Sequence, residues 1–127
     1  MRIVTGPEVA DFVGGKLGTI IYPPFTCMGL EKDGEICGGV VMNCYTGPDI
    51  HFTVAGRGWS RPFLREWGDY VFNQLGCLRA TAITEQDHVI DLAIRMGGHV
   101  EGILRDQFGE GRDGTILGVL KKDFRFK

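Results

Sequence analysis

The chain has 127 residues, of which 43% are hydrophobic, and its 14 basic and 16 acidic side chains leave a formal net charge of −2. That length supports one compact core and is too short for two ordinary domains, so we expect a single domain over residues 1–127. The basic residues are scattered, which argues against direct nucleic-acid binding. The apolar runs are short and no signal-peptide pattern opens the chain, so we expect a cytoplasmic protein without membrane contact.

The cysteines show no CxxC pair, and their spacing relative to the histidines is not typical of a zinc site. We therefore expect no metal, and we interpret the cysteines as reduced, mostly buried thiols. They are Cys27, Cys37, Cys44 and Cys77.

A first helix is predicted after a short apolar start. Thr5-Gly6-Pro7-Glu8 matches a capping box with proline in the first turn. Glycines near 14–18 are expected to end this helix. Its apolar residues recur at helical spacing and are Val9, Phe12, Val13 and Leu17. Pro23 and Pro24 then favour an extended connector.

Two β-branched, apolar stretches flank Lys32-Asp33-Gly34, and Asp-Gly between such stretches is a strong signal for a β-hairpin. After a turn at Gly47-Pro48-Asp49, apolar residues alternate with His51 and Thr53, a pattern that predicts a third strand. This strand runs without a break into Ala55-Gly56-Arg57-Gly58.

Ser60 is suited to cap a second helix that ends at Gly76. Residues 77–83 are rich in β-branched and small side chains and predict a strand. Thr84-Glu85-Gln86-Asp87 resembles a capping box for a third helix, which ends at Gly97-Gly98, and the remainder predicts a closing pair of strands. This order of elements indicates an α/β protein. The second helix should bury Phe63, Leu64, Trp67 and Val71 in a core.

Two interpretations of the turn Gly56-Arg57-Gly58 stay open. It is either a tight corner or a phosphate site, because free backbone N–H groups at the start of a helix bind anions. The glycines allow close approach to a ligand, and Arg57 and Arg61 carry charge suited to phosphate oxygens. The GxGxxG and GxxxxGK[ST] fingerprints are absent, which disfavours the nucleotide-binding classes that use them.

Residues 53–58, Thr-Val-Ala-Gly-Arg-Gly, resemble the [QR]xxGxG motif that holds the pyrophosphate of acetyl-coenzyme A (acetyl-CoA) in the GNAT N-acetyltransferase superfamily. Downstream, DYVFNQLGCLRATAI and QDHVIDLAIRMGGHVEGILRD resemble the branch that acetylates ribosomal-protein N-termini. The resemblance covers about residues 27–122, and the chain looks like the short stand-alone members, often phage-encoded. It implies one GNAT-like domain, with a mixed, mostly antiparallel sheet flanked by helices.

The resemblance also implies that acetyl-CoA is the co-substrate and that its pantetheine arm pairs with the strand before the loop. The implied cofactor-binding residues are Phe52, Thr53, Val54, Ala55, Gly56, Arg57, Gly58, Trp59, Ser60, Arg61 and Gln86. His51 is our first candidate for the general base, because histidine exchanges protons near neutral pH, and Glu101 is the second. The structural alternatives are a surface histidine on a strand and a carboxylate held by hydrogen bonds.

The sequence departs from the family pattern at three positions. Thr53 stands where the motif has Gln or Arg, and phosphate binding should survive this change because the loop binds mainly through N–H groups. Gly98 replaces the Phe of a Gly-Phe pair, which should remove a core aromatic and loosen the turn. Ala93 stands where many relatives carry the Tyr thought to protonate the leaving thiolate, so the acid stays unassigned.

Three functions stay open from the sequence. The first is an acetyl-CoA-dependent N-acetyltransferase that transfers acetyl directly, in a ternary complex, to a primary amine of a protein N-terminus, a lysine or a small molecule. The second is a non-catalytic GNAT-fold module that binds acyl-CoA or a protein partner, and the third is a structural α/β domain. Dimers are common in the family, so a homodimer is one expected state, while the amine acceptor is not specified.

Overall fold

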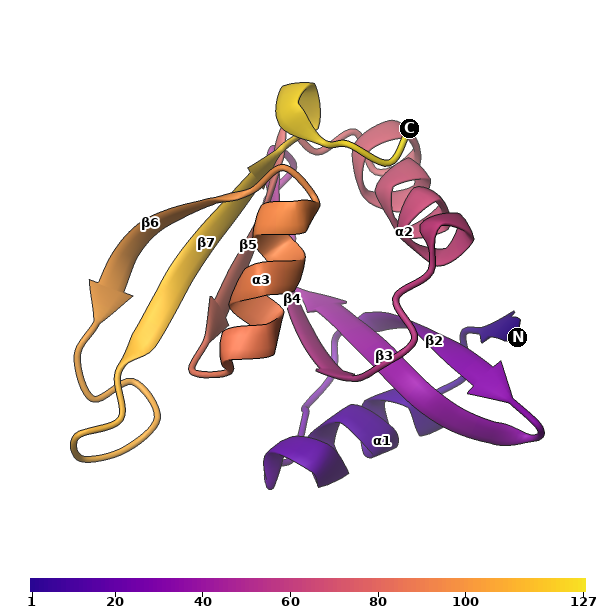
Figure 1. Cartoon of the computed structure of the whole chain (residues 1–127), viewed down its shortest axis with the longest axis horizontal. Coiled ribbons are helices and arrows are strands. Elements are labelled where there is room, and N and C mark those ends of the chain that lie inside the picture. The colour runs from indigo at the N-terminus through magenta and orange to yellow at the C-terminus, as the bar shows by residue number, and fades with distance from the viewer.

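Seven strands form one sheet in the computed structural model, which describes all 127 residues (Figure 1). The strand order is β1-β2-β3-β4-β5-β7-β6, and each neighbouring pair is antiparallel except β4 and β5. The expected α/β fold with a mixed, mostly antiparallel sheet is confirmed. The strands are β1 Arg2–Val4, β2 Thr26–Lys32, β3 Glu35–Asn43, β4 Asp49–Gly56, β5 Arg79–Thr84, β6 His99–Leu104 and β7 Gly114–Leu120.

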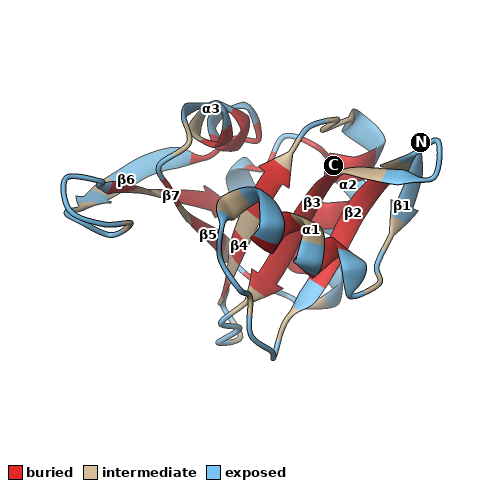
Figure 2. Cartoon of the chain, turned by 90° about the horizontal axis from the view of Figure 1, so that it is seen from below, coloured by how far each residue is buried: buried red, intermediate tan, exposed pale blue.

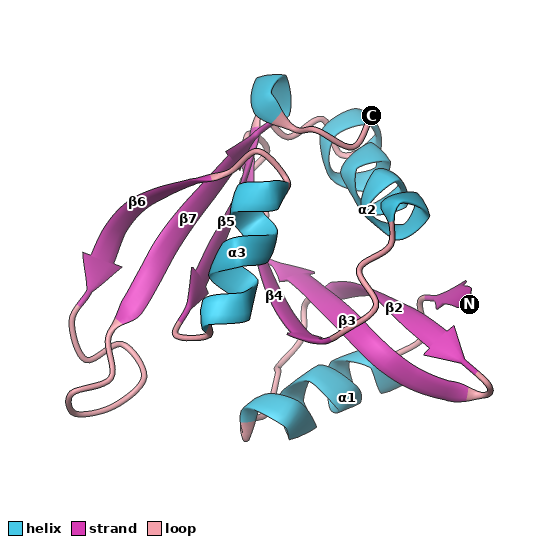
Figure 3. Cartoon of the chain, viewed as in Figure 1, coloured by secondary structure: helices cyan, strands magenta, loops and turns pink.

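Three α-helices cover the two faces of the sheet: α1 Glu8–Leu17, α2 Arg61–Gly68 and α3 Asp87–Arg95 (Figure 3). The side chains of β4 show how the faces are divided. Ala55 packs in the cluster under α1, whereas Phe52 and Val54 belong to the cluster under α2 and α3. One face of β4 is therefore covered by α1 and the other by α2 and α3.

The β2–β3 hairpin has the turn that its sequence predicts. Asp33 and Gly34 both have positive φ, 54° and 81°, as a type I′ turn requires. Gly29 of β2 pairs with Gly39 of β3, and a Cβ at either would overlap Val9 of α1. The two glycines thus let α1 lie close against the hairpin.

Two hydrophobic clusters make the core. The smaller lies under α1 and joins Val9, Ala10 and Val13 to Cys27, Val41 and Ala55. The larger has 21 buried residues and includes Phe63, Leu64, Trp67 and Val71, so their predicted burial is confirmed. In Figure 2 the buried residues run along β2, β3 and β4, whereas β6 is largely exposed.

Both predicted capping boxes are wrong, although the helices they introduce are present. The N-cap of α1 is Pro7 and makes no side-chain cap bond, since the turn at Gly6-Pro7 places Thr5 too early in the chain. The N-cap of α3 is Gln86, also without a side-chain cap bond. Thr84 Oγ1 instead accepts a hydrogen bond from the Gln86 N–H at 3.0 Å, which closes a local turn before the helix.

Ser60 caps α2 as predicted, because its hydroxyl accepts a hydrogen bond from the Phe63 N–H at 3.3 Å. The α-helix ends at Gly68, however, and residues Asp69–Gln74 continue as a π-helix. Val71 and Phe72 of this π-helix are both buried. Sequence reasoning also missed the short strand β1 and the 3-10 turn Lys121–Asp123.

Gly98 contributes no aromatic ring to the core, as expected, and it leaves no void. A Cβ at Gly98 would lie 2.8 Å from the Ala93 carbonyl oxygen and 2.9 Å from Val119 Cγ2, so neighbouring atoms already fill this position. Aromatic rings enter the larger cluster from the C-terminal tail instead. The rings of Phe124 and Phe126 lie 6.0 Å apart, and Phe124 lies 5.9 Å from Trp67.

The cysteines are less uniformly buried than expected. Cys27 and Cys77 are buried and Cys37 is half-buried, but Cys44 is exposed. Burial raises the pKa of the Cys27 and Cys77 thiols, which keeps both protonated at neutral pH. No helix of the structure combines the length and the apolar character needed to cross a membrane.

Two helical glycines should respond oppositely to substitution by alanine. A Cβ at Gly68 of α2 would overlap the Phe124 ring, so Gly68→Ala should lower the free energy of unfolding by about 1–3 kcal/mol. Gly15 of α1 is exposed with nothing near its Cβ position, so Gly15→Ala should raise it by about 0.5–1 kcal/mol. Thermal and urea unfolding measure the change in the free energy of unfolding for each variant. Equal effects of the two substitutions would contradict this packing.

Candidate active site

A cleft opens where the two parallel strands separate. β4 and β5 pair only through Asp49 with Arg79, Ile50 with Ala80 and His51 with Thr81. Beyond these pairs the strands diverge towards their C-terminal ends (Figure 1). The resulting cleft has a volume of about 550 Å³ and is lined by both strands, by the end of α1 and by the β6–β7 loop.

The backbone of β4 faces this cleft beyond His51. The Val54 carbonyl accepts a hydrogen bond from Gln86 Nε2 at 3.4 Å, which shows that it points towards the β5 side. In an extended strand the N–H and C=O of one residue point the same way, so the Val54 amide also faces the cleft. The structure thus brings together Gln86 and the Phe52–Ala55 stretch, both predicted to contact the cofactor.

The loop that follows β4 presents free backbone donors. The Arg57 N–H donates to the Cys37 carbonyl at 2.9 Å, and the Ser60 N–H donates to the Gly58 carbonyl at 2.7 Å. The N–H groups of Gly58 and Trp59 have no acceptor among the backbone carbonyls. They precede the first turn of α2, where the helix dipole is positive, so the loop can bind an anionic oxygen.

The two glycines of the loop have different physical roles. Gly56 lies against β3, where a Cβ would overlap the Cys37 carbonyl oxygen and crowd Gly38. Gly58 has φ of 98°, which favours glycine, and its Cβ position faces Cys37 Sγ and Leu30 at 3.4 Å each. Gly56 therefore permits close packing of β4 on β3, while Gly58 sets the backbone path that exposes the N–H groups.

The larger side chains at the loop are turned to the α2–α3 side. The Trp59 ring lies 5.5 Å from the Phe63 ring, and the Trp59 carbonyl accepts a hydrogen bond from Arg95 at 2.9 Å. The Arg61 guanidinium lies 5.6 Å from the centre of the Phe126 ring. Arg57 is exposed and lines a second hollow, together with Gly56 and Gln86.

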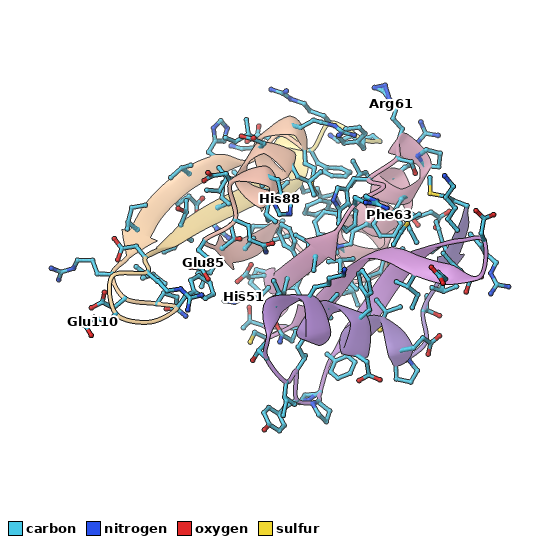
Figure 4. All side chains as sticks on the ribbon, turned by 60° about the horizontal axis from the view of Figure 1, so that its bottom comes forward. His51, Arg61, Phe63, Glu85, His88 and Glu110 are labelled. Carbon is cyan, nitrogen blue, oxygen red and sulfur yellow. The ribbon has the colours of Figure 1, made fainter.

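His51 lies at the closed end of the cleft, next to the carboxylate of Asp49. Its Nε2 is 3.4 Å from Asp49 Oδ2, and its side chain is 38% exposed. Asp49 Oδ1 in turn accepts a hydrogen bond from the Thr81 hydroxyl at 2.8 Å. In Figure 4, His51 and Glu85 lie on the side of the molecule between α1 and the β6–β7 loop. A carboxylate on one imidazole nitrogen orients the ring and leaves the other nitrogen for a substrate proton.

Glu101 belongs to the same charged network but does not line the cleft. It accepts hydrogen bonds from both terminal nitrogens of Arg79, at 2.5 and 3.3 Å. This pairing raises the pKa of Arg79, whose guanidinium therefore stays charged. The two side chains meet above Gly118 of β7, where any Cβ would overlap them. Glu101 thus has a structural role as the partner of Arg79, and of the two candidate bases only His51 lines the cleft.

Sequence reasoning missed Asp49, Thr81 and Arg79, which tie His51 to the sheet. Arg79 Nε donates to Thr81 Oγ1 at 3.1 Å and lies 3.6 Å from Asp49 Oδ1. One signal was available, because Asp49 precedes His51 by two residues and alternate residues of a strand share a face. The partners on β5 follow only from the register of the two strands.

The cleft contains no tyrosine. Ala93 is buried, and the hydroxyl groups in the lining belong to Thr19, Thr53, Thr81 and Thr84. Its one acidic lining residue, Glu85, forms an ion pair with Arg112 of the β6–β7 loop. This pair joins the end of β5 to the loop across the mouth of the cleft.

These features fit the parts of acetyl-CoA separately. The free N–H groups after β4 suit the pyrophosphate, and the Val54 N–H, on the β4 edge that faces the cleft, offers a donor for an amide carbonyl of the pantetheine arm. The arm would extend towards His51, because the strands converge there. The arrangement therefore leads from a candidate phosphate site to a candidate base.

No protein-family model matches the sequence, and no curated protein matches it. Solved structures do match. A spermidine N-acetyltransferase SpeG variant from Vibrio cholerae superimposes with a TM-score of 0.73 at 13% identity, over 96% of each chain. A spermidine/spermine N-acetyltransferase SpeG variant from the same organism gives 0.72 at 13% identity, over 95% of each chain.

A protein described as a probable acetyltransferase gives a TM-score of 0.67 at 19% identity, over 79% of this chain and 63% of that one. At such identities the likeness concerns the fold and leaves the substrate open. The cleft between β4 and β5 and the loop before α2 thus occur in a chain that has the GNAT fold of these acetyltransferases.

Proposed function

We propose that the protein is an acetyl-CoA-dependent N-acetyltransferase that transfers the acetyl group directly to a primary amine. The observation that carries the proposal is the separation of β4 from β5, which exposes the Val54 backbone and ends at the free N–H groups of Gly58 and Trp59. If the turn Gly56-Arg57-Gly58 were only a tight corner, the fold would not require both separated strands and free N–H groups beside it. The acetyltransferase fold of the structural neighbours supports the same proposal.

Acetyl transfer requires a neutral amine, a polarised thioester carbonyl and close alignment of the two. In the proposed reaction the amine nitrogen attacks the carbonyl carbon, and His51 accepts the proton that the amine loses. Asp49 stabilises the imidazolium that forms. A backbone N–H of β4 donates to the carbonyl oxygen as negative charge develops there. The carbon–sulfur bond then breaks, and the thiolate takes a proton from His51 or solvent.

The cleft favours an acceptor with a single amine. The titles of the matched SpeG structures name spermidine and spermine, which carry several positive charges. In this chain the only acidic residue in the lining is Glu85, and Arg112 already neutralises it. Cations attract carboxylates and repel guanidinium groups, so a polyamine gains little here. We propose a protein N-terminus, a lysine or a small monoamine instead.

The absence of a tyrosine from the cleft keeps a second candidate function open. A GNAT-fold module that binds acyl-CoA without turnover would need the phosphate loop and the β4 edge, but no acid for the leaving thiolate. The two candidates agree on ligand binding and differ on thiol release. They are therefore separated by two measurements, one of binding and one of turnover.

Acetyl-CoA should raise the melting temperature of the protein, since a ligand that binds only the folded state adds about 2.7 kcal/mol of stability at 100 times its Kd.

Arg57→Glu places a negative charge beside the loop and should weaken the binding of acetyl-CoA about tenfold, as measured by calorimetry. The matched control is Arg105→Glu, on the exposed loop after β6, which should bind normally. Equal binding by both variants would contradict a phosphate site at residues 57–60.

His51→Ala should lower kcat for thiol release by about 100-fold while the Kd for acetyl-CoA stays unchanged, because the variant removes the base but not the β4 edge. His99→Ala, at an exposed histidine on β6, serves as the control and should retain full kcat. The assay uses a panel of peptides, lysine derivatives, monoamines and spermidine. An unchanged kcat in His51→Ala would exclude His51 as base, and silence of the wild type across the panel would favour the binding module.

A further inference from the structure

A cluster of three arginines lies outside the cleft, on the side of α2 and α3. Arg61 comes from the first turn of α2, Arg95 from the last turn of α3, and Arg125 from the C-terminal tail. With Phe126 they line a hollow of about 350 Å³. We call this group the arginine cluster. Figure 4 shows Arg61 at the edge of the molecule, away from His51.

The arginine cluster is held in place by the tail. The guanidinium groups of Arg61 and Arg95 each lie 5.6 Å from the centre of the Phe126 ring, which is 9% exposed. The backbone N–H of Arg125 donates to the Met96 carbonyl at 3.0 Å, which fixes the tail beside α3. The side chains are thus positioned by contacts that do not use up their charges.

No acidic side chain neutralises this cluster. The ion pairs of the chain involve Arg2, Arg79, Arg112 and His51, and none includes Arg61, Arg95 or Arg125. Gathering three positive charges without a partner costs electrostatic free energy, and an anion in the hollow would relieve it. The fork of N–H groups on a guanidinium matches phosphate oxygens in particular.

The cluster adjoins the proposed phosphate loop. Arg95 donates to the Trp59 carbonyl at 2.9 Å, and the N–H of Trp59 is one of the two free donors of the loop. Arg61 follows Gly58 by three residues. An anion in the hollow and a pyrophosphate on the loop would therefore be neighbours, close enough to belong to one ligand.

We propose that the arginine cluster binds the 3′-phosphate of the coenzyme A ribose. The inference rests on the proposed function, since it assumes that acetyl-CoA binds with its pyrophosphate at residues 57–60. With that group placed, the only other phosphate of coenzyme A is the monoester on its ribose. The cluster then distinguishes coenzyme A from its 3′-dephospho form.

The test compares the Kd values of acetyl-CoA and acetyl-3′-dephospho-CoA by calorimetry at fixed salt. The wild type should bind acetyl-CoA about ten- to a hundredfold more tightly, as two or three charge-assisted bonds predict. Arg125→Gln should reduce this ratio about tenfold and leave the affinity for the dephospho form unchanged. Arg125 is chosen because its side chain does not stack on Phe126.

The control is Arg65→Gln, one turn from Arg61 on α2 and exposed, which lines a different hollow and should keep the wild-type ratio. Equal Kd values for the two ligands in the wild type would overturn the 3′-phosphate site while leaving the proposed function intact. A ratio that Arg125→Gln does not change would also overturn it. Binding of neither ligand would overturn the proposed function itself.

Discussion

Parallel pairing between β4 and β5 stops after His51 and Thr81, and the candidate site of the protein depends on this limit. Had the pairing continued, the Val54 backbone would be bonded to β5 and no cleft would exist. The two halves of the sheet are packed by different helices, α1 on the β2–β4 half and α3 on the β5–β7–β6 half. Each half can therefore follow its own twist once the strands separate.

The charged network lies where the two halves are still joined. Asp49 on β4 accepts a hydrogen bond from Thr81 on β5, and Arg79 on β5 continues to Glu101 on β6. These bonds connect three strands across the sheet at the point of separation. Because Asp49 also contacts His51, the same residues that hold the sheet together position the candidate base at the closed end of the cleft.

Local patterns in the sequence were enough for most of the fold. The Asp33-Gly34 turn, the Ser60 cap and the three amphipathic helices all follow from short stretches of chain, and each is present. The two capping boxes failed because a local motif does not specify which residue starts the helix. The π-helix after Gly68 was not predicted; its Phe72 ring lies 5.2 Å from the ring of Phe124, a contact between distant parts of the chain that no local pattern reports.

The candidate site was accessible from the sequence only where it is continuous. His51 and the residues of the 52–61 segment lie on one strand and its loop, so spacing and resemblance predicted them together. Asp49 and Thr81 come together only through the register of β4 and β5, 32 positions apart. The pairing of Glu101 with Arg79 also depends on a distant residue, because it requires Gly118 on the strand between them. The arginine cluster likewise needs the C-terminal tail folded back onto α2 and α3.

The central claim is that the β4 edge beyond His51 is a binding surface for acetyl-CoA. Amide hydrogen exchange with and without acetyl-CoA measures this directly. Val54 is the reporting residue, because its N–H faces the cleft. Its neighbour Thr53, which pairs with β3, serves for comparison. The account predicts that acetyl-CoA slows exchange at Val54 and at Gly58 and Trp59, and leaves β6 unchanged. Slowed exchange confined to the groove of Thr26, Met42 and Tyr70, with Val54 unaffected, would contradict it.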